Sequence, residues 1–201
     1  MGYNLNKSSD EDLVKTYIDG NPDAFAILVQ RYQNRLYKLA YMMLGNESDA
    51  EDVVQDVMIT VYQKLASYKS RASFFTWLYR ITLNRCRDRL RRKKLVSLLF
   101  YHPNGADTEI EHADTRVSKI DNPIWDALHQ SEINRIVEKY MLELNPVYRQ
   151  IIILRDIEGL AYDEICKIMG LSMSAMKSKL FRARNQLRQK LMPFREELLY
   201  D

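Results

Sequence analysis

The sequence predicts an all-α protein, in which two small helical domains are joined by an irregular acidic linker. Apolar residues recur at helical spacing along most of the chain, and no window shows the convincing apolar/polar alternation of a strand. Only 6 of the 201 residues are glycine. The periodicity breaks over residues 96–128 and then resumes, so we expect domains at 1–95 and 129–201.

Composition argues against several classes of protein. The chain begins with a polar, acidic stretch, so no signal peptide is predicted. No apolar run approaches the roughly 18 residues that a membrane span needs. The 2 cysteines lie far apart and the 3 histidines are scattered, which favours neither a disulfide framework nor a zinc site. We therefore expect a reduced, cytoplasmic protein with no cofactor and no membrane insertion of its own.

The N-terminal domain is expected to begin with two helices. The first starts near Ser9 and ends at Gly20, because glycine readily adopts the left-handed conformation that closes a helix. Asn21 and Pro22 match an N-cap followed by proline in the first turn of the second helix. That helix is expected to stop near Gly45.

Two further helices complete this domain. Ser48 and Glu51 match a capping box for the third helix, which has its valines on one side. A polar loop ends at Ser73, and a fourth helix follows over about 74–94. We interpret Cys86, which lies in the apolar stripe of that helix, as a core side chain rather than a reactive thiol.

The linker over 96–128 combines prolines and glycine with a negative charge. Its charged residues are Asp107, Glu109, Glu111, Asp114, Asp121 and Asp126 against Arg116 and Lys119.

The C-terminal domain has the outline of a helix-turn-helix. Helical periodicity resumes at 124–144, and Pro146 opens a further helix that Gly159 ends. A short helix over 162–169 and a longer one over 172–191 follow, separated by a turn that contains glycine.

The last of these helices is unusually basic. One stripe faces a core, and it consists of Met176, Leu180, Ala183, Leu187 and Leu191. No acid lies between Lys177 and Lys190. Such a helix is either a solvated surface or, as the second helix of a helix-turn-helix, a reader of the DNA major groove. Phe181 would then either pack on the preceding helix or touch a thymine methyl group.

Two more charged surfaces lie in the N-terminal domain. A basic run over 80–94, opposed only by Asp88, follows a group of aromatic residues, a combination that suits single-stranded nucleic acid unless the rings are simply core. Asp49, Asp52 and Asp56 lie on one helix with Ile59 exposed among them. Three monodentate carboxylates make a poor metal site, so a protein partner with a basic surface is the better interpretation.

Four stretches together resemble the extracytoplasmic-function (ECF) sigma factors of bacteria. They are "DAEDVVQDV" (49–57), "SFFTWLYRITLNRCRDRLRR" (73–92), "LNPVYRQIIILRDIEGLAYDEICKIMGLS" (144–172) and "KSKLFRARNQLR" (177–188). The resemblance implies a non-enzymatic subunit that directs core RNA polymerase to promoters, with sigma region 2 in residues 1–95 and sigma region 4 in 129–201. It also implies control by an anti-sigma factor in a stress response, and a linker threaded through the polymerase.

The resemblance assigns residues to three surfaces. The polymerase-binding surface, which would dock on the β′ clamp helices beside the β subunit, is Asp49, Asp52, Gln55, Asp56 and Ile59. The surface for the −10 promoter strand is Tyr68, Lys69, Arg71, Phe74, Trp77, Arg80, Asn84, Arg87 and Arg91. The surface for the −35 element is Ser174, Lys177, Ser178, Phe181, Arg182 and Arg184.

The chain departs from the family pattern at several positions. Ala161 stands where a serine commonly caps the helix. The missing cap is expected to lower the stability of the domain by about 1 kcal/mol. Residues 174–176 replace the usual Gly-Thr-Val, and Lys179 replaces an arginine.

Two other functions remain open from the residues alone. A free-standing helix-turn-helix regulator would bind duplex DNA without polymerase, but it would not need the acidic surface. A metal-dependent nuclease would use the carboxylates, and EDTA would abolish its activity.

Overall fold

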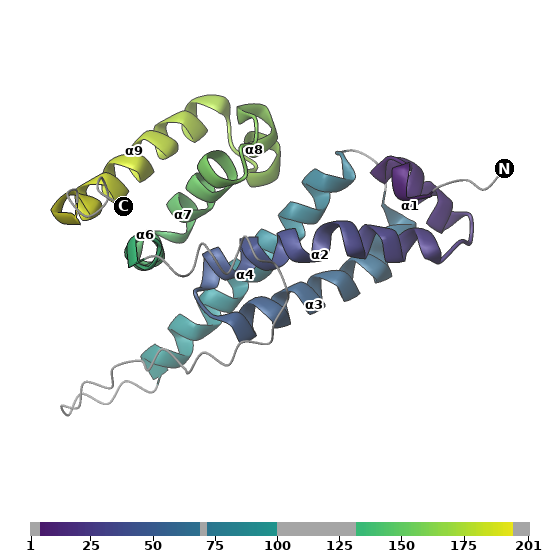
Figure 1. Cartoon of the computed structure of the whole chain (residues 1–201), viewed down its shortest axis with the longest axis horizontal. Coiled ribbons are helices and arrows are strands. Elements are labelled where there is room, and N and C mark those ends of the chain that lie inside the picture. Colours follow the sequence, from purple (N-terminus) through teal and green to yellow (C-terminus); the bar gives the residue numbers. More distant parts are fainter. Residues whose placement is uncertain (1–4, 69–71, 100–131, 195–201) are drawn as a thin grey trace. The chain divides into compact units, whose positions relative to one another are not determined.

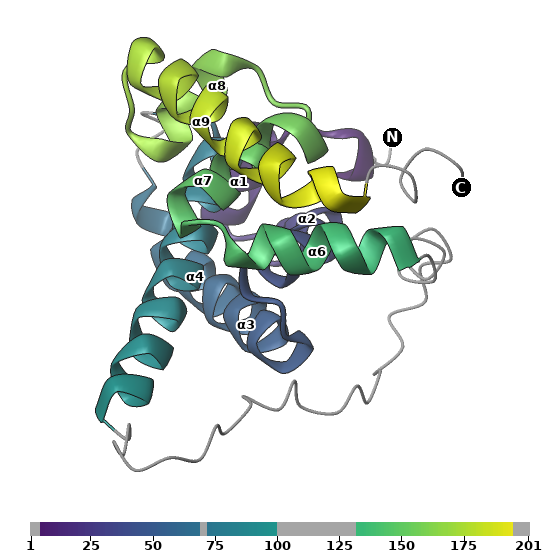
Figure 2. The same ribbon diagram turned by 90° about the vertical axis from the view of Figure 1, so that its left-hand side faces the viewer.

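The computed structural model describes residues 5–68, 72–99 and 132–194, and in these ranges the regular structure is helical. Figures 1 and 2 show two views of the chain. The expected all-α fold is confirmed. The predicted linker lies outside the described residues, except for its first few positions, and so does the predicted helical stretch before residue 132.

In the part of the chain described up to residue 99, four α-helices form the N-terminal group. They are α1 (Asp10–Ile18), α2 (Asp23–Leu44), α3 (Glu47–Lys64) and α4 (Phe74–Leu99), with a short 3-10 turn, η2 (Leu65–Ser67), after α3. The core between them includes Leu13, Leu36, Leu39, Val57, Leu65, Leu78 and Tyr79, each 1% exposed or less.

Local interactions start the first two helices as expected. The Ser9 hydroxyl accepts a hydrogen bond from the amide of Asp12 at 3.1 Å, and the Asn21 side chain accepts one from the amide of Asp23 at 3.0 Å. Gly20 has a φ of 100°, which only glycine adopts without strain.

Two predicted helix boundaries in this group are wrong. Helix α3 begins at Glu47, so Ser48 lies inside its first turn and is not its N-cap. Helix α4 continues to Leu99, beyond the expected end near residue 94 and into the predicted linker. Cys86 is fully buried in that helix, and burial raises the pKa of its thiol to about 12, which agrees with a core side chain.

The C-terminal group contains four α-helices within the described residues 132–194. They are α6 (Glu132–Glu143), α7 (Pro146–Ile152), α8 (Tyr162–Met169) and α9 (Met173–Leu191). Helix α9 packs against the other three, as Figure 1 shows for α7 and α8. Gly170, with a φ of 67°, ends α8, and the Ser172 hydroxyl accepts a hydrogen bond from the amide of Ala175 at 3.3 Å to open α9. The predicted helix-turn-helix is therefore present.

Helix α7 and the turn after it contain two features that the periodicity does not indicate. Directly after Ile152 the backbone widens into a π-helical turn, η3 (Ile153–Ile157), and Gly159 then ends the helical run. Arg149 is buried, and its guanidinium donates to the carbonyl oxygens of Met141 (2.9 Å), Leu142 and Leu144 (3.3 Å). It therefore supplies donors to carbonyls at the end of α6 and directly after it, where helical partners run out, although the Met141 carbonyl also accepts the amide of Leu144 at 3.2 Å.

None of the described helices is long and apolar enough to cross a membrane.

Candidate nucleic-acid interface

The exposed face of α9 presents cations next to a buried apolar stripe. Met176 and Ala183 are 0% exposed and Leu180 is 3% exposed, which anchors the helix to its neighbours. Ser174, Lys177, Ser178 and Arg182 are exposed.

Phe181 is the most exposed large apolar side chain on this face. It is 67% exposed, so it does not pack against the preceding helix, which was one of its two predicted positions. An aromatic ring held among cations is available for an apolar contact with a base edge.

Arg184, which is also predicted to contact the −35 element, is exposed but pairs with a carboxylate of the protein itself. Its Nε donates to Oδ2 of Asp156 at 3.1 Å, and its Nη2 forms an ion pair with Oδ1. These hydrogen bonds raise the pKa of Arg184. Asp156 belongs to the π-helical turn after α7, so the pair joins this turn to α9 across 28 residues of sequence, and a phosphate would have to compete with this carboxylate.

The ring of Tyr162 contacts two cations. The guanidinium carbon of Arg155 is 4.7 Å from the ring centroid, and Nζ of Lys177 is 5.9 Å from it. Sequence analysis missed Arg155 and Tyr162. The available signal was an aromatic residue at the first position of a helix-turn-helix element, directly after a glycine-containing turn.

The first turn of α8 shows the consequence of the alanine at position 161. Ala161 has no side-chain acceptor, but its amide donates to Oε2 of Glu164 at 2.9 Å, so half of a capping box remains. We expect Ala161→Ser to raise the free energy of unfolding of this domain by about 1 kcal/mol, because the hydroxyl would accept the amide of Glu164. Urea denaturation followed by circular dichroism measures the change, with Ala161→Gly as a variant that adds no acceptor. Equal stability of the serine and alanine chains would contradict the prediction.

The aromatic group before α4 divides into core and surface. Phe74 is 1% exposed, so its prediction as a DNA-contacting residue is wrong for this structure: it is a core side chain. Tyr68 and Trp77 are half-buried, with ring centroids 5.1 Å apart. Lys69 and Arg71 lie outside the described residues.

Helix α4 presents the remaining predicted −10 residues. Arg80 and Asn84 are exposed, and Arg87 donates to the Asn84 side chain. The Arg91 side chain is 80% exposed and lies 3.7 Å from the carboxylate of Asp88.

The basic and acidic surfaces of the N-terminal group neutralise each other in part. Nε of Arg89 donates to Oδ1 of Asp49 and Nη2 to Oδ2 of Asp52, both at 2.8 Å, and Lys93 forms an ion pair with Asp49. Asp88 is therefore not the sole counter-charge of the basic run.

Asp49 is not part of an exposed acidic face, which corrects the expectation for it. The residue is 5% exposed. Burial alone would raise the pKa of its carboxyl, but hydrogen bonds from Lys93 and Arg89 outweigh burial and hold the pKa below its usual range. Asp49 links the start of α3 to α4, because its carboxylate pairs with Arg89 and Lys93 of α4.

The rest of the predicted polymerase-binding surface is exposed on α3. The Asp52 side chain is 53% exposed, Gln55 and Asp56 are exposed, and Ile59 is 50% exposed. An apolar side chain among acids has the composition of a small protein interface. In the part of the chain that the structure describes, no three His, Cys, Asp or Glu residues are grouped so as to hold a metal ion.

Comparison with known families assigns both helical groups. Residues 28–96 match the family model for sigma-70 region 2, and residues 134–187 match that for sigma-70 region 4. The chain is 34% identical over 183 residues to the ECF RNA polymerase sigma factor SigW of Bacillus subtilis, covering 89% of this chain and 94% of SigW. It is 33% identical over 189 residues to the ECF RNA polymerase sigma-E factor of Haemophilus influenzae, covering 92% of this chain and 96% of that factor.

Solved structures show the same arrangement of elements. The structure of CnrH in complex with the cytosolic domain of CnrY superimposes with a TM-score of 0.66 at 26% identity, covering 92% of this chain and 99% of that one. The sigma factor RpoE of Bartonella quintana, solved with the anti-sigma factor NepR, superimposes with a TM-score of 0.61 at 22% identity, covering 86% of this chain and 98% of that one. This similarity concerns the fold alone.

Proposed function

This chain belongs to the extracytoplasmic-function family of RNA polymerase sigma factors, and from that premise we propose how its surfaces divide the work of promoter recognition. A sigma factor is a non-enzymatic subunit that directs core RNA polymerase to promoters. Family membership therefore rules out the two alternative functions, that of a free-standing regulator and that of a nuclease.

Helix α9 is the proposed reader of the −35 element. The observation that carries this assignment is its outer face, where Lys177, Phe181 and Arg182 are exposed beside a buried stripe and no acid interrupts the cations. In a helix-turn-helix the N-terminal end of the second helix enters the major groove, where arginine reads guanine and an apolar group reads thymine. Ser174 and Ser178 are placed to contact either bases or phosphates.

We expect Arg182→Ala to reduce transcription from promoters that depend on their −35 element by about tenfold, the cost of one lost base or phosphate contact. Run-off transcription by the reconstituted holoenzyme measures this loss. Arg188→Ala is the matched control, because it removes the same charge from an exposed position farther along α9. Equal losses in the two variants would mean that only net charge matters and would remove Arg182 from the reading surface.

The region before α4 and its outer face are the proposed site for the −10 element. Tyr68 and Trp77 form a half-exposed ring pair, and base-on-ring stacking suits a strand taken out of the duplex. Arg80, Arg87 and Arg91 would hold the adjoining phosphates, with Asn84 between them. Lys69 and Arg71 belong to this proposal from sequence alone.

Helix α3 is the proposed dock for core polymerase. Asp52, Gln55, Asp56 and Ile59 form its exposed surface, which suits the basic clamp helices of the β′ subunit. Asp49 is buried and links α3 to α4, so it does not belong to this exposed surface. The acidic linker would follow the family path through the polymerase beside the β subunit.

A regulatory partner and a compartment complete the proposal. CnrH, a structural relative, was solved with the cytosolic domain of CnrY. We assign to this chain an anti-sigma factor that withholds it from polymerase until a stress signal arrives. Since core polymerase and the nucleoid are cytoplasmic, the chain would act in the cytoplasm.

A further inference from the structure

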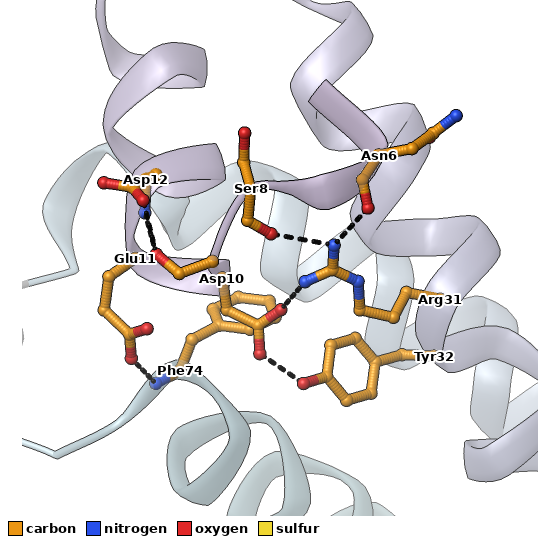
Figure 3. Close-up of polar contacts among 9 residues, drawn as sticks. Asn6, Ser8, Asp10, Glu11, Asp12, Arg31, Tyr32 and Phe74 are labelled. Carbon is orange, nitrogen blue, oxygen red and sulfur yellow. Dashed lines mark hydrogen bonds and ion pairs between the residues drawn. The ribbon is translucent and has the colours of Figure 1, made fainter. Parts of the chain in front are cut away.

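The first turn of α1 connects three parts of the N-terminal group (Figure 3). The Asp10 carboxylate pairs with the guanidinium of Arg31 and accepts a hydrogen bond from the hydroxyl of Tyr32. Arg31 also donates to the carbonyl oxygens of Ser8 at 3.0 Å and Asn6 at 3.3 Å. These contacts join the chain that enters α1 to helix α2.

Glu11 extends the connection to α4. Its Oε1 accepts a hydrogen bond from the backbone amide of Phe74, 63 residues away, at 3.4 Å. Phe74 is the first residue of α4, where amides lack helical partners and a carboxylate is favoured by the helix dipole. The hydroxyl of Ser73 accepts the amide of Thr76 at 3.2 Å, so α4 is capped both by its preceding residue and by α1.

A chain of aromatic rings links this cap to the proposed −10 surface. The Phe74 ring centroid lies 5.8 Å from that of Tyr32, 5.9 Å from that of Trp77 and 6.3 Å from that of Tyr68. Helix α1 also packs against η2, which ends directly before Tyr68. Both elements that carry the Tyr68–Trp77 ring pair therefore rest on α1.

The neighbouring acid Asp12 does not take part in this connection. Its carboxylate accepts a hydrogen bond from the hydroxyl of Ser9 at 2.7 Å, which is an interaction within the N-cap of α1. Adjacent acids of one turn thus have different roles. Asp12 interacts within the N-cap of α1, whereas Asp10 contacts α2 and Glu11 contacts α4.

We propose that Glu11, held in place by the contacts of Asp10 with Arg31 and Tyr32, is a positioning residue for promoter opening. By fixing the start of α4 it sets the separation and orientation of the Tyr68 and Trp77 rings that would receive an unpaired base. A side chain that stacks on a base must be ordered beforehand, because ordering it during the reaction adds to the barrier. This inference rests on the proposed role of the ring pair in −10 recognition.

The test measures promoter opening by the holoenzyme. The probe is a promoter selected from a random library by the unaltered holoenzyme, with 2-aminopurine in its −10 element, and a matched template premelted across that element. We expect Glu11→Ala to slow opening of the duplex by about fivefold, which corresponds to one lost hydrogen bond. The premelted template should show a smaller loss, and binding to core polymerase should not change.

Three comparison variants keep the result interpretable. Glu11→Gln retains an acceptor oxygen and should restore much of the rate, and it carries the test if Glu11→Ala lowers the Tm of the free chain. Asp12→Ala removes an acid from the same turn and should open promoters at the unaltered rate. Trp77→Ala tests the ring pair itself.

The outcomes separate this inference from the function on which it rests. Slow opening in both Glu11→Ala and Trp77→Ala, with rescue by Glu11→Gln, supports the positioning role. Slow opening in Trp77→Ala alone, with Glu11→Ala equal to Asp12→Ala, overturns it and leaves the −10 assignment standing. Unaltered opening in both variants overturns the −10 assignment and the positioning role together.

Discussion

Charge reversal at Asp52 and Asp56, both to Lys, is expected to weaken binding of the chain to core RNA polymerase by about 100-fold. Each substitution replaces attraction to a basic partner by repulsion, which at an interface rim is worth about 1.4 kcal/mol, or tenfold. Both carboxylates belong to exposed positions on α3. Titration of core polymerase with fluorescently labelled protein measures the affinity, and co-elution on gel filtration gives a second readout.

The contact between Asp52 and Arg89 requires a second variant. Lysine at position 52 faces Arg89, whose Nη2 lies 2.8 Å from Oδ2 of Asp52, so the double variant also disturbs the joint between α3 and α4. Asp56→Lys alone tests docking apart from that joint and should cost about tenfold. Glu51→Lys reverses another exposed acid of the same helix and serves as the control. Binding of Asp56→Lys at the level of this control would remove the surface from the polymerase interface.

Replacement of Arg149 by Leu is expected to lower the free energy of unfolding of the C-terminal domain by about 3 kcal/mol. The guanidinium of Arg149 donates to carbonyl oxygens of Met141 and Leu142, at the negative end of α6, and of Leu144 directly after it. Leucine fills part of the space but supplies no donor, so these acceptors lose the guanidinium, while the Met141 carbonyl keeps another donor, the amide of Leu144 at 3.2 Å. Burial lowers the pKa of Arg149 to about 10, and the side chain therefore remains charged at neutral pH.

Amide hydrogen exchange on the full chain locates this loss. Exchange in α7, α8 and α9 should become faster in Arg149→Leu, since α9 packs on α7 and depends on it, whereas exchange in α1 should not change. Arg135→Leu removes an exposed arginine of α6 and is the matched control. Arg149→Lys should be intermediate, because an ammonium group cannot match the fork of a guanidinium. If Arg149→Leu exchanges like Arg135→Leu, the three carbonyl contacts do not stabilise the domain.

Short-range patterns in the sequence predicted most of the helices and the location of the proposed DNA-reading surface. The caps at Ser9 and Ser172 and the left-handed glycine at position 170 act within a few residues of the helix ends that they define. The stripe that contains Met176 and Leu180 follows from the helical period alone, and the cations opposite it must then be exposed. Exposure of Phe181, by contrast, was left open by the periodicity.

Tertiary structure decided which polar groups of different elements form ion pairs and hydrogen bonds with one another. Arg89 and Asp49 are 40 residues apart, Arg184 and Asp156 are 28 apart, and Glu11 and Phe74 are 63 apart. The helical period shows which face of each helix is polar, but not how far each helix is shifted and rotated against its neighbour when the core packs. The sequence by itself therefore determined most of the helices, their apolar faces and the family. Only core packing determined that Asp49 is buried against α4, that Arg184 pairs with the π-helical turn after α7, and that α1 caps the start of α4.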